Sequence, residues 1–168
     1  MSRVHYLAYG SNLHPGRLGA RVPIIALLGT AALPGWRLTF GKRGADGSGK
    51  CDLEYTGGAE ECAYGAVYAL EARAKRTLDR IEGLGKGYGE RRLVLPSCGE
   101  VRLYLALPDA RDPSCSPFDW YRALVLAGAR YHGFPAGYLA RIQATPTIHD
   151  PDPARRARHS RRLAVLGT

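Results

Sequence analysis

Several features that define common classes of protein are missing from this sequence. No apolar run approaches the ~18 residues that a membrane-spanning helix needs, so we expect no membrane partner. The first ten residues lack a charged stretch followed by a long apolar stretch, which is the pattern of a secretory signal peptide. These two absences favour a cytoplasmic location.

Motifs for binding metals are also missing. The four cysteines (Cys51, Cys62, Cys98 and Cys115) contain no C-x-x-C pair, and the five histidines show no paired spacing with them or with each other. A zinc site needs clustered ligands, so we predict no metal and no cofactor. In a reducing compartment the cysteines are expected to stay free thiols. A nucleophilic Cys-His pair is an alternative that the sequence leaves open, although no spacing indicates one.

Acidic residues are scarce relative to basic ones: 15 Asp and Glu against 24 Lys and Arg give a net charge of +9. Part of the excess lies near the C-terminus, in Arg155, Arg156, Arg158, Arg161 and Arg162. The excess fits a solvated surface, and it also fits attraction for anions such as nucleic acid. No nucleic-acid-binding motif accompanies it, so a nucleic-acid partner is not expected.

The 168 residues suit one domain with a tail, and we divide them into a catalytic domain at 1–145 and a basic tail at 146–168. Alternating and β-branched patterns predict strands, at 3–9, 36–40, 51–56, 64–70, 90–95 and 101–107, with a loop at 41–50. Helical spacing predicts helices, at 71–83, 116–131 and 135–142. This order predicts an α+β fold with a mixed, mostly antiparallel sheet, closed into a β-barrel with helices packed outside.

Glu82 is the most informative residue. It follows Ala74, Leu78 and Ile81 on the apolar face of the helix predicted at 71–83, near the C-terminal end. A carboxylate on such a face is either a hydrogen-bonded structural group or an acid whose pKa burial raises toward neutrality. The unfavourable end of the helix dipole favours the second interpretation. We therefore take Glu82 as a candidate general acid/base.

Two glycine-containing segments flank this candidate. The turn Tyr9-Gly10-Ser11-Asn12-Leu13 follows the first predicted strand, where its backbone N–H groups either form a plain turn or bind a carboxylate or oxyanion. The segment 83–89 superficially suggests a phosphate-binding loop, but it follows a helix and precedes a strand, which is the wrong order.

Together these segments resemble the γ-glutamylcyclotransferase family. The turn at residues 9–13 is similar to the family's N-terminal signature loop, and Leu78-Asp79-Arg80-Ile81-Glu82-Gly83 is similar to the segment that carries its catalytic glutamate. Tyr88 and Tyr104 match aromatic positions of the family, and the resemblance continues through residues 121–142. The Arg-rich segment after Pro146 lies outside the pattern.

The resemblance implies a fold, an activity and site residues. The fold is a mixed barrel with outer helices, and the reaction turns a γ-glutamyl amino acid or related amide into 5-oxoproline and a free amino acid or amine, without a cofactor. Glu82 would be the general acid/base, with Tyr9, Gly10, Ser11, Asn12, Leu13, Tyr88 and Tyr104 binding the substrate. Cyclotransferases of γ-glutamylamines, γ-glutamyl conjugates or glutathione, a catalytically silent relative and a polyanion-binding module stay open, and so does a homodimer.

Overall fold

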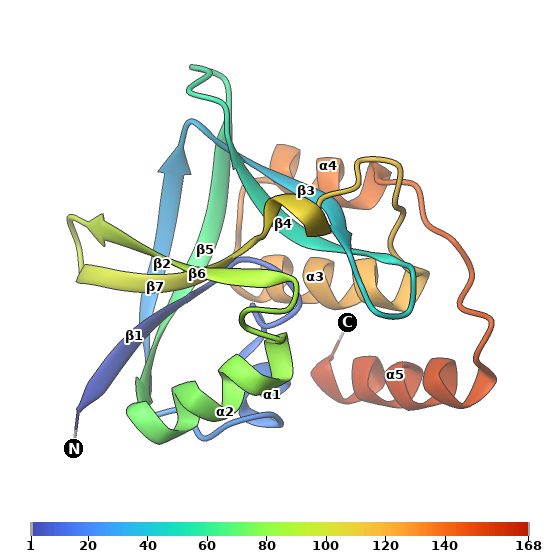
Figure 1. The fold of residues 1–168 in the computed structure, drawn as a ribbon, viewed down its shortest axis with the longest axis horizontal. Coiled ribbons are helices and arrows are strands. Elements are labelled where there is room, and N and C mark those ends of the chain that lie inside the picture. Colours follow the sequence, from blue (N-terminus) through green and yellow to red (C-terminus); the bar gives the residue numbers. More distant parts are fainter. Residues whose placement is uncertain (1, 168) are drawn as a thin grey trace.

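A five-stranded sheet forms the centre of the fold, and the computed structural model describes residues 2–167. Its strands in spatial order are β2 (Ala26–Pro34), β5 (Cys62–Glu71), β1 (Arg3–Ala8), β7 (Gly99–Ala106) and β6 (Tyr88–Leu95). Only β1 and β7 pair in parallel; the other neighbours are antiparallel. The mixed, mainly antiparallel sheet of the prediction is confirmed (Figure 1).

The prediction of a closed barrel is wrong for the part of the chain that is described. Closure requires the two outer strands of a sheet to pair, and here β2 and β6 remain at opposite edges. Strands β3 (Trp36–Arg43) and β4 (Gly49–Tyr55) pair only with each other and form a separate ribbon. This ribbon also shortens the loop predicted at 41–50, because Lys42 and Lys50 are already paired.

Five α-helices surround the strands (Figure 1). They are α1 (Pro15–Gly19), α2 (Ala72–Glu82), α3 (Asp119–Tyr131), α4 (Ala136–Ala144) and α5 (Pro153–Leu166), with a single 3₁₀ turn, η1 (Pro108–Ala110), before α3. Helix α3 begins later than predicted, because Phe118 rather than Ser116 is its N-cap. None of the helices in residues 2–167 is both long and apolar enough to cross a membrane.

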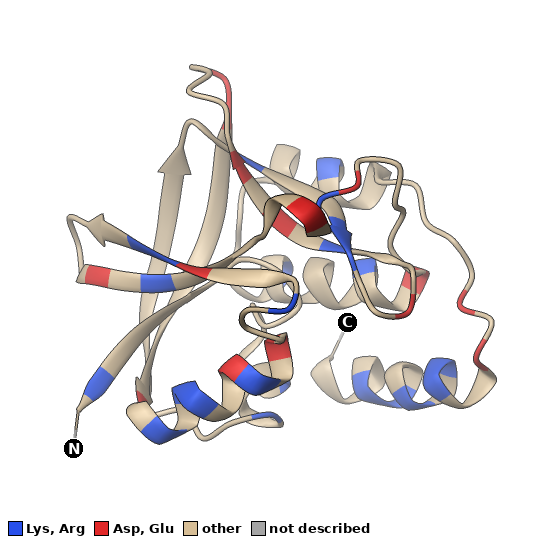
Figure 2. Cartoon of the chain, viewed as in Figure 1, with Lys and Arg blue, Asp and Glu red and all other residues tan. Residues whose placement is uncertain are grey.

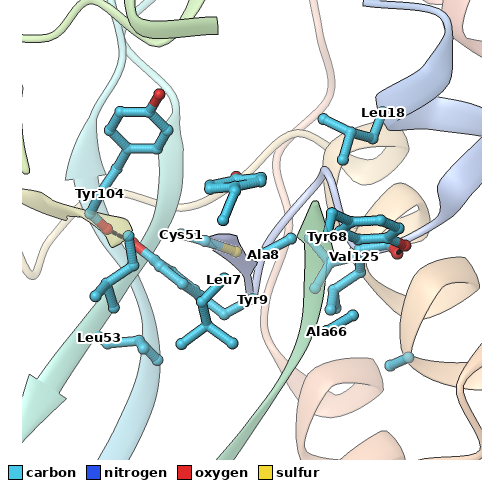
Figure 3. Packing of buried hydrophobic residues seen from close by; sticks show 14 of the residues in the cluster. Leu7, Ala8, Tyr9, Leu18, Cys51, Leu53, Ala66, Tyr68, Tyr104 and Val125 are labelled. Carbon is cyan, nitrogen blue, oxygen red and sulfur yellow. Dashed lines mark hydrogen bonds between the residues drawn. The ribbon is translucent and has the colours of Figure 1, made fainter. Parts of the chain in front are cut away.

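The hydrophobic core lies on both sides of β1. Leu7 and Ala8, at the end of this strand, lie between Leu53 on one side and Tyr68 and Val125 on the other (Figure 3). All of these side chains are almost completely buried. The core therefore holds the C-terminal end of β1, and the loop after it, in a fixed position.

Helix α5 folds the basic C-terminal segment onto the rest of the chain. Its inner face carries His159, Leu163 and Leu166, and the His159 ring stacks on Trp120 of α3 with 3.7 Å between ring centroids. Arg158 and Arg161 of this helix are exposed. The blue stretches along α5 mark its basic residues (Figure 2). The domain boundary at residue 145 stays a prediction.

Candidate active site

The loop after β1 turns tightly against β4. The N–H of Leu13 donates to the carbonyl of Gly10 at 3.1 Å, which closes the turn. A Cβ atom on Gly10 would lie 2.8 Å from the Cβ of Cys51, so only glycine fits here. The N–H groups of Ser11 and Asn12 have no acceptor within residues 2–167.

Helix α3 fixes the same loop from the other side. A Cβ atom on Gly128 would lie 2.3 Å from the Cβ of Leu13, so the helix backbone lies directly against the loop. The Leu13 carbonyl accepts hydrogen bonds from the Tyr68 hydroxyl and, at 2.7 Å, from Nε2 of His132. Leu13 is thus a buried anchor of the loop.

Helix α2 carries Glu82 as its last residue. Gly83 adopts a left-handed conformation with φ of 71°, which ends the helix, and the N–H of Leu84 donates to the Asp79 carbonyl at 2.8 Å. Ala74 and Leu78 are buried as predicted, whereas Ile81 is 45% exposed and does not belong to the apolar face. Glu82 lies one turn after the buried Leu78, and its carboxylate points toward the loop after β1, where Asn12 contacts it.

The Glu82 carboxylate is held by two donors, and 17% of its side chain is exposed. Its Oε1 accepts a hydrogen bond from Asn12 Nδ2 at 2.9 Å and an ion-paired hydrogen bond from Arg21 Nη1 at 2.6 Å. Arg21 also donates to Asn12 Oδ1 at 3.2 Å, so the three side chains form a closed triangle. The charged guanidinium stabilises an ionised carboxylate. Oε2 has no hydrogen-bond partner among the described residues.

A small pocket, with a cavity volume of about 30 Å³, opens beside this carboxylate. Its walls come from the β1 loop, β4, the end of α2, β6, β7 and α3. The lining residues are Tyr6, Tyr9, Gly10, Ser11, Asn12, Cys51, Glu82, Tyr88, Tyr104 and Tyr121. Tyrosine rings make up much of this surface, so the pocket has flat apolar walls and polar groups at fixed points.

The hydroxyls of these tyrosines connect the strands around the pocket. Tyr9 donates to the carbonyl of Tyr104, and Tyr88 donates to the carbonyl of Cys51 at 2.6 Å. Tyr121 accepts from the N–H of Cys51 at 3.0 Å, and Tyr104 donates to Asp79 Oδ1 at 2.6 Å. Burial raises the pKa of each of these phenols, which therefore remain neutral at physiological pH.

Comparisons with known proteins agree with this geometry, although no family model matches the chain. The chain is 29% identical over 173 residues to γ-glutamyl cyclotransferase aclK of Aspergillus oryzae, covering 88% of this chain and 63% of that protein. It is 27% identical over 151 residues to human γ-glutamylcyclotransferase, covering 83% of this chain and 77% of the human protein. Both relatives are named γ-glutamylcyclotransferases, so the resemblance to this family that the sequence motifs indicated is confirmed.

A solved structure titled γ-glutamyl cyclotransferase shares the fold, with a TM-score of 0.76 and 21% identity over 95% of this chain and 99% of that one. The expected fold type, a mixed α+β fold with a mainly antiparallel sheet, is thus confirmed. The matched part of the chain spans less than two thirds of the fungal relative, so the activity of the chain is treated below as a proposal.

The structure brings together most of the site residues that the sequence predicted. Tyr9, Gly10, Ser11, Asn12, Glu82, Tyr88 and Tyr104 all line the one pocket. Leu13 does not, because its side chain is completely buried in the core. Its contribution is to hold the loop.

Sequence reasoning missed Arg21, Tyr6, Cys51 and Tyr121. Arg21 lies outside any regular pattern, and its pairing with Glu82 joins residues far apart in the chain. Tyr6 could have been predicted, because it lies on the first predicted strand, just before the loop. Its hydroxyl accepts a hydrogen bond from Asn12 at 3.1 Å. Cys51 and Tyr121 carried no signal that distinguishes them from core residues.

Unpaired positive charge lies close to the pocket. Lys42 is 9% exposed, and its Nζ lies 4.7 Å from the centre of the Tyr88 ring. Burial and the nearby Lys50 lower the pKa of Lys42, and no carboxylate of residues 2–167 forms an ion pair with it. Within the same residues, no cluster of three or more His, Cys, Asp or Glu side chains is placed to hold a metal ion.

A larger cavity of about 510 Å³ lies elsewhere, between the β3–β4 ribbon and the loop before α3. Its acidic residues Asp52, Glu54 and Asp112 are already paired, with Arg111 at 3.0 Å, Arg37 at 2.6 Å and Arg43 at 3.2 Å. It contains no carboxylate comparable with Glu82. The small pocket is therefore the better candidate for catalysis.

Proposed function

We propose that the protein is a γ-glutamylcyclotransferase that converts γ-glutamyl amino acids into 5-oxoproline and the free amino acid. The observation that carries the proposal is the Glu82 carboxylate: Asn12 and Arg21 hold its Oε1, while its Oε2 has no partner among residues 2–167. One oxygen is thus oriented, and the other remains for a substrate proton. The family of the chain supports the same reaction.

Glu82 moves the protons in this mechanism. It accepts a proton from the substrate α-ammonium group, and the freed amine attacks the γ-carbonyl carbon. The bond from this carbon to the leaving nitrogen then breaks as Glu82 returns the proton to that nitrogen. Over the whole reaction the attacking nitrogen loses two protons and the leaving nitrogen gains two, so the enzyme returns to its initial state.

In the proposed mechanism, the loop after β1 supplies the groups that stabilise negative charge on the substrate. The free N–H groups of Ser11 and Asn12 are donors for the glutamyl carboxylate or for the oxyanion that forms on the γ-carbonyl oxygen. Because Gly10 packs directly on Cys51 and Leu13 is anchored in the core, these donors are preorganised.

The tyrosine walls favour a folded substrate. Tyr9 and Tyr88 are fixed by hydrogen bonds to backbone carbonyls, so the pocket keeps its shape without a ligand. A γ-glutamyl chain bound in a bent conformation brings its amine close to its own γ-carbonyl. Most of the entropy cost of ring closure is then met on binding.

The substitution Glu82→Gln tests the proposal. It keeps an oxygen for Asn12 but cannot accept the substrate proton, so we expect kcat/KM to fall by about 10²- to 10⁴-fold. The measurement is 5-oxoproline release from γ-glutamyl-alanine, γ-glutamyl-ethylamine and glutathione. Glu100→Gln is the matched control, because Glu100 lies on β7 with 51% of its side chain exposed.

Circular dichroism and thermal unfolding of both variants separate catalysis from folding. Retained turnover in folded Glu82→Gln would remove Glu82 from the mechanism. Absence of 5-oxoproline from every substrate, with folded wild-type protein, would remove the cyclotransferase activity itself.

A further inference from the structure

Arg21 follows helix α1, and the end of that helix determines where it lies. Its N–H donates to the carbonyl of Leu18 at 2.9 Å, and the N–H of Val22 donates to the same carbonyl at 3.0 Å. The side chains of Leu18 and Val22 are almost completely buried. The backbone that carries Arg21 is therefore anchored in the core, and its side chain reaches Glu82 from a fixed position.

The guanidinium of Arg21 contacts the Glu82 carboxylate through one nitrogen. Nη1 donates to Glu82 Oε1 at 2.6 Å and to Asn12 Oδ1 at 3.2 Å. In a bidentate pair of arginine and carboxylate, two nitrogens bind both carboxylate oxygens. The single contact leaves Oε2 without a hydrogen-bond partner among residues 2–167. Glu82 thus has a positive charge close to one oxygen while its other oxygen remains free.

Arg21 also determines the orientation of the Asn12 amide. Because the amide oxygen accepts from Arg21, the amide nitrogen donates to Glu82 Oε1 at 2.9 Å and to the Tyr6 hydroxyl at 3.1 Å. A guanidinium has no acceptor, so a flipped amide would direct its N–H groups at the donors of Arg21. Arg21 therefore holds the second donor of the Glu82 carboxylate in place as well.

The charge of Arg21 affects both proton transfers that we propose for Glu82. A guanidinium at hydrogen-bond distance favours the ionised carboxylate over the neutral acid. Glu82 is then ready to accept a proton from the substrate. Once protonated, it has lost its favourable interaction with Arg21, so it returns the proton to the leaving nitrogen more readily.

Several other titratable groups surround Glu82, but none of them forms a hydrogen bond or ion pair with its carboxylate in residues 2–167. They lie on every neighbouring element: Tyr6 (β1), Tyr9 (the loop after β1), Arg17 (α1), Lys42 (β3), Cys51 (β4), Lys75 and Asp79 (α2), Tyr88 (β6), Tyr104 (β7) and Tyr121 (α3). Burial raises the pKa of the tyrosines and of Cys51, which stay neutral at acidic pH. His14 and His132, next to the loop, have pKa values lowered by burial and titrate at acidic pH.

We infer that Arg21 is a positioning residue of the proposed reaction: its contact through one nitrogen keeps Glu82 ionised with one oxygen free, and it sets the pH above which Glu82 acts as a base. This inference rests on the proposed function. The sequence attributed the tuning of Glu82 to burial, whereas the inference assigns it to an ion pair with a residue 61 positions away.

The variants Arg21→Gln and Arg21→Lys separate the charge of this residue from its hydrogen bonds. Glutamine can donate to Glu82 but is uncharged, so kcat/KM at pH 7 should fall by about 10- to 100-fold, the value of one charge-assisted hydrogen bond. The acid limb of the profile of kcat/KM against pH should move upward by about 1 to 2 pH units, because the carboxyl stays protonated to higher pH. Lysine restores the charge and should return the acid limb most of the way to its wild-type position.

The measurement is 5-oxoproline release from γ-glutamyl-alanine between acidic and neutral pH. His14 and His132 are present in every variant, so their titration does not alter the difference between the profiles. Arg37→Gln is the matched control and should change neither kcat/KM nor the acid limb. Arg37 also donates to a glutamate, Glu54, at 2.6 Å, but it lines the larger cavity.

Each outcome either supports or overturns the inference. Unchanged kcat/KM in Arg21→Gln overturns it, and so does a loss of activity with an unmoved acid limb, which would indicate a purely structural role. An acid limb that moves equally far in Arg21→Lys also overturns it. All these results leave the cyclotransferase activity standing, whereas wild-type protein that releases no 5-oxoproline overturns the proposed function and the inference with it. Circular dichroism verifies folding, and Arg21→Met replaces Arg21→Gln if the latter does not fold.

Discussion

Two buried cations differ in whether the protein supplies them with a carboxylate partner. Lys75, on α2, is 3% exposed, and its Nζ is bonded to Asp79 and, at 2.7 Å, to Glu90. Its Nζ also lies 4.7 Å from the centre of the Tyr104 ring. Arg17 is almost equally buried, at 7%, and has no carboxylate partner within the described chain.

The two cations differ in what neutralises them. Asp79 and Glu90 neutralise the ammonium of Lys75, so the protein itself supplies its counter-ions. Burial lowers the pKa of Arg17 to about 9, and the charges of Arg21 and Arg162 act in the same direction. Burial alone therefore does not determine whether the fold supplies a counter-ion to a cation.

The largest effect on stability is expected from a comparison of two single variants, each of which removes one of the two cations. Lys75→Met leaves Asp79 and Glu90 without their partner, so the free energy of unfolding should fall by about 2 to 3 kcal/mol. This loss is at the low end for a broken buried ion pair, because both carboxylates are partly exposed. Arg17→Met removes only like-charge repulsion and keeps an apolar stem, so it should change stability by less than about 1 kcal/mol.

Urea unfolding of both variants measures this contrast at pH 7. A loss in Arg17→Met as large as that in Lys75→Met would mean that Arg17 already has a stabilising partner in the free protein. The comparison would then fail.

An effect that is absent at pH 7 and develops only at acidic pH is expected from His159. Burial and the surrounding arginines lower its pKa to about 4, from about 6.5 in the unfolded chain. The unfolded state therefore binds more protons between these values, and stability is complete above pH 6.5 and falls as pH drops toward 4. His159→Phe keeps a ring on Trp120 and should flatten this decline, by up to about 3 kcal/mol at pH 4.

Thermal or urea unfolding at several pH values checks this expectation. A residual slope should remain in the variant, because burial also lowers the pKa values of His14 and His132. Identical pH profiles for the variant and the wild type would mean that His159 is not held neutral by burial and the surrounding arginines.

The smallest effect concerns Tyr104. Its hydroxyl belongs to the closed network of Lys75, because it donates to Asp79 at 2.6 Å. Tyr104→Phe should therefore cost about 1 kcal/mol of stability, the value of one hydrogen bond. A rise in KM of more than about tenfold with unchanged stability would assign the hydroxyl to substrate binding instead.

Local patterns in the sequence, together with the resemblance to a known family, were sufficient for much of the site. Helical spacing placed Glu82 at the end of α2, and the turn signal at Gly10 marked the loop that holds Asn12. Both signals are local, since a helix and a tight turn depend on residues close in the sequence. The fold class followed from the order of such elements.

The remaining features depend on contacts between distant residues. Strand β2 has a register shift between Leu27 and Gly29, and it lacks a clear alternation of buried and exposed residues, so no pattern marked it. Barrel closure depends on which edges pair, and no single strand encodes that. Arg21 could not be predicted for the same reason: its ion pair with Glu82 depends on the packing of α2 beside it, which no local pattern encodes.

The close contact between Gly128 and Leu13 has a consequence for the site. A single methyl group added to α3 at this position would push the β1 loop away and separate Asn12 from Glu82. Such a protein would keep Glu82 and its core while losing the alignment of Glu82 with the loop. The small size of residue 128 is therefore as much a requirement of the proposed site as the side chains that line its pocket.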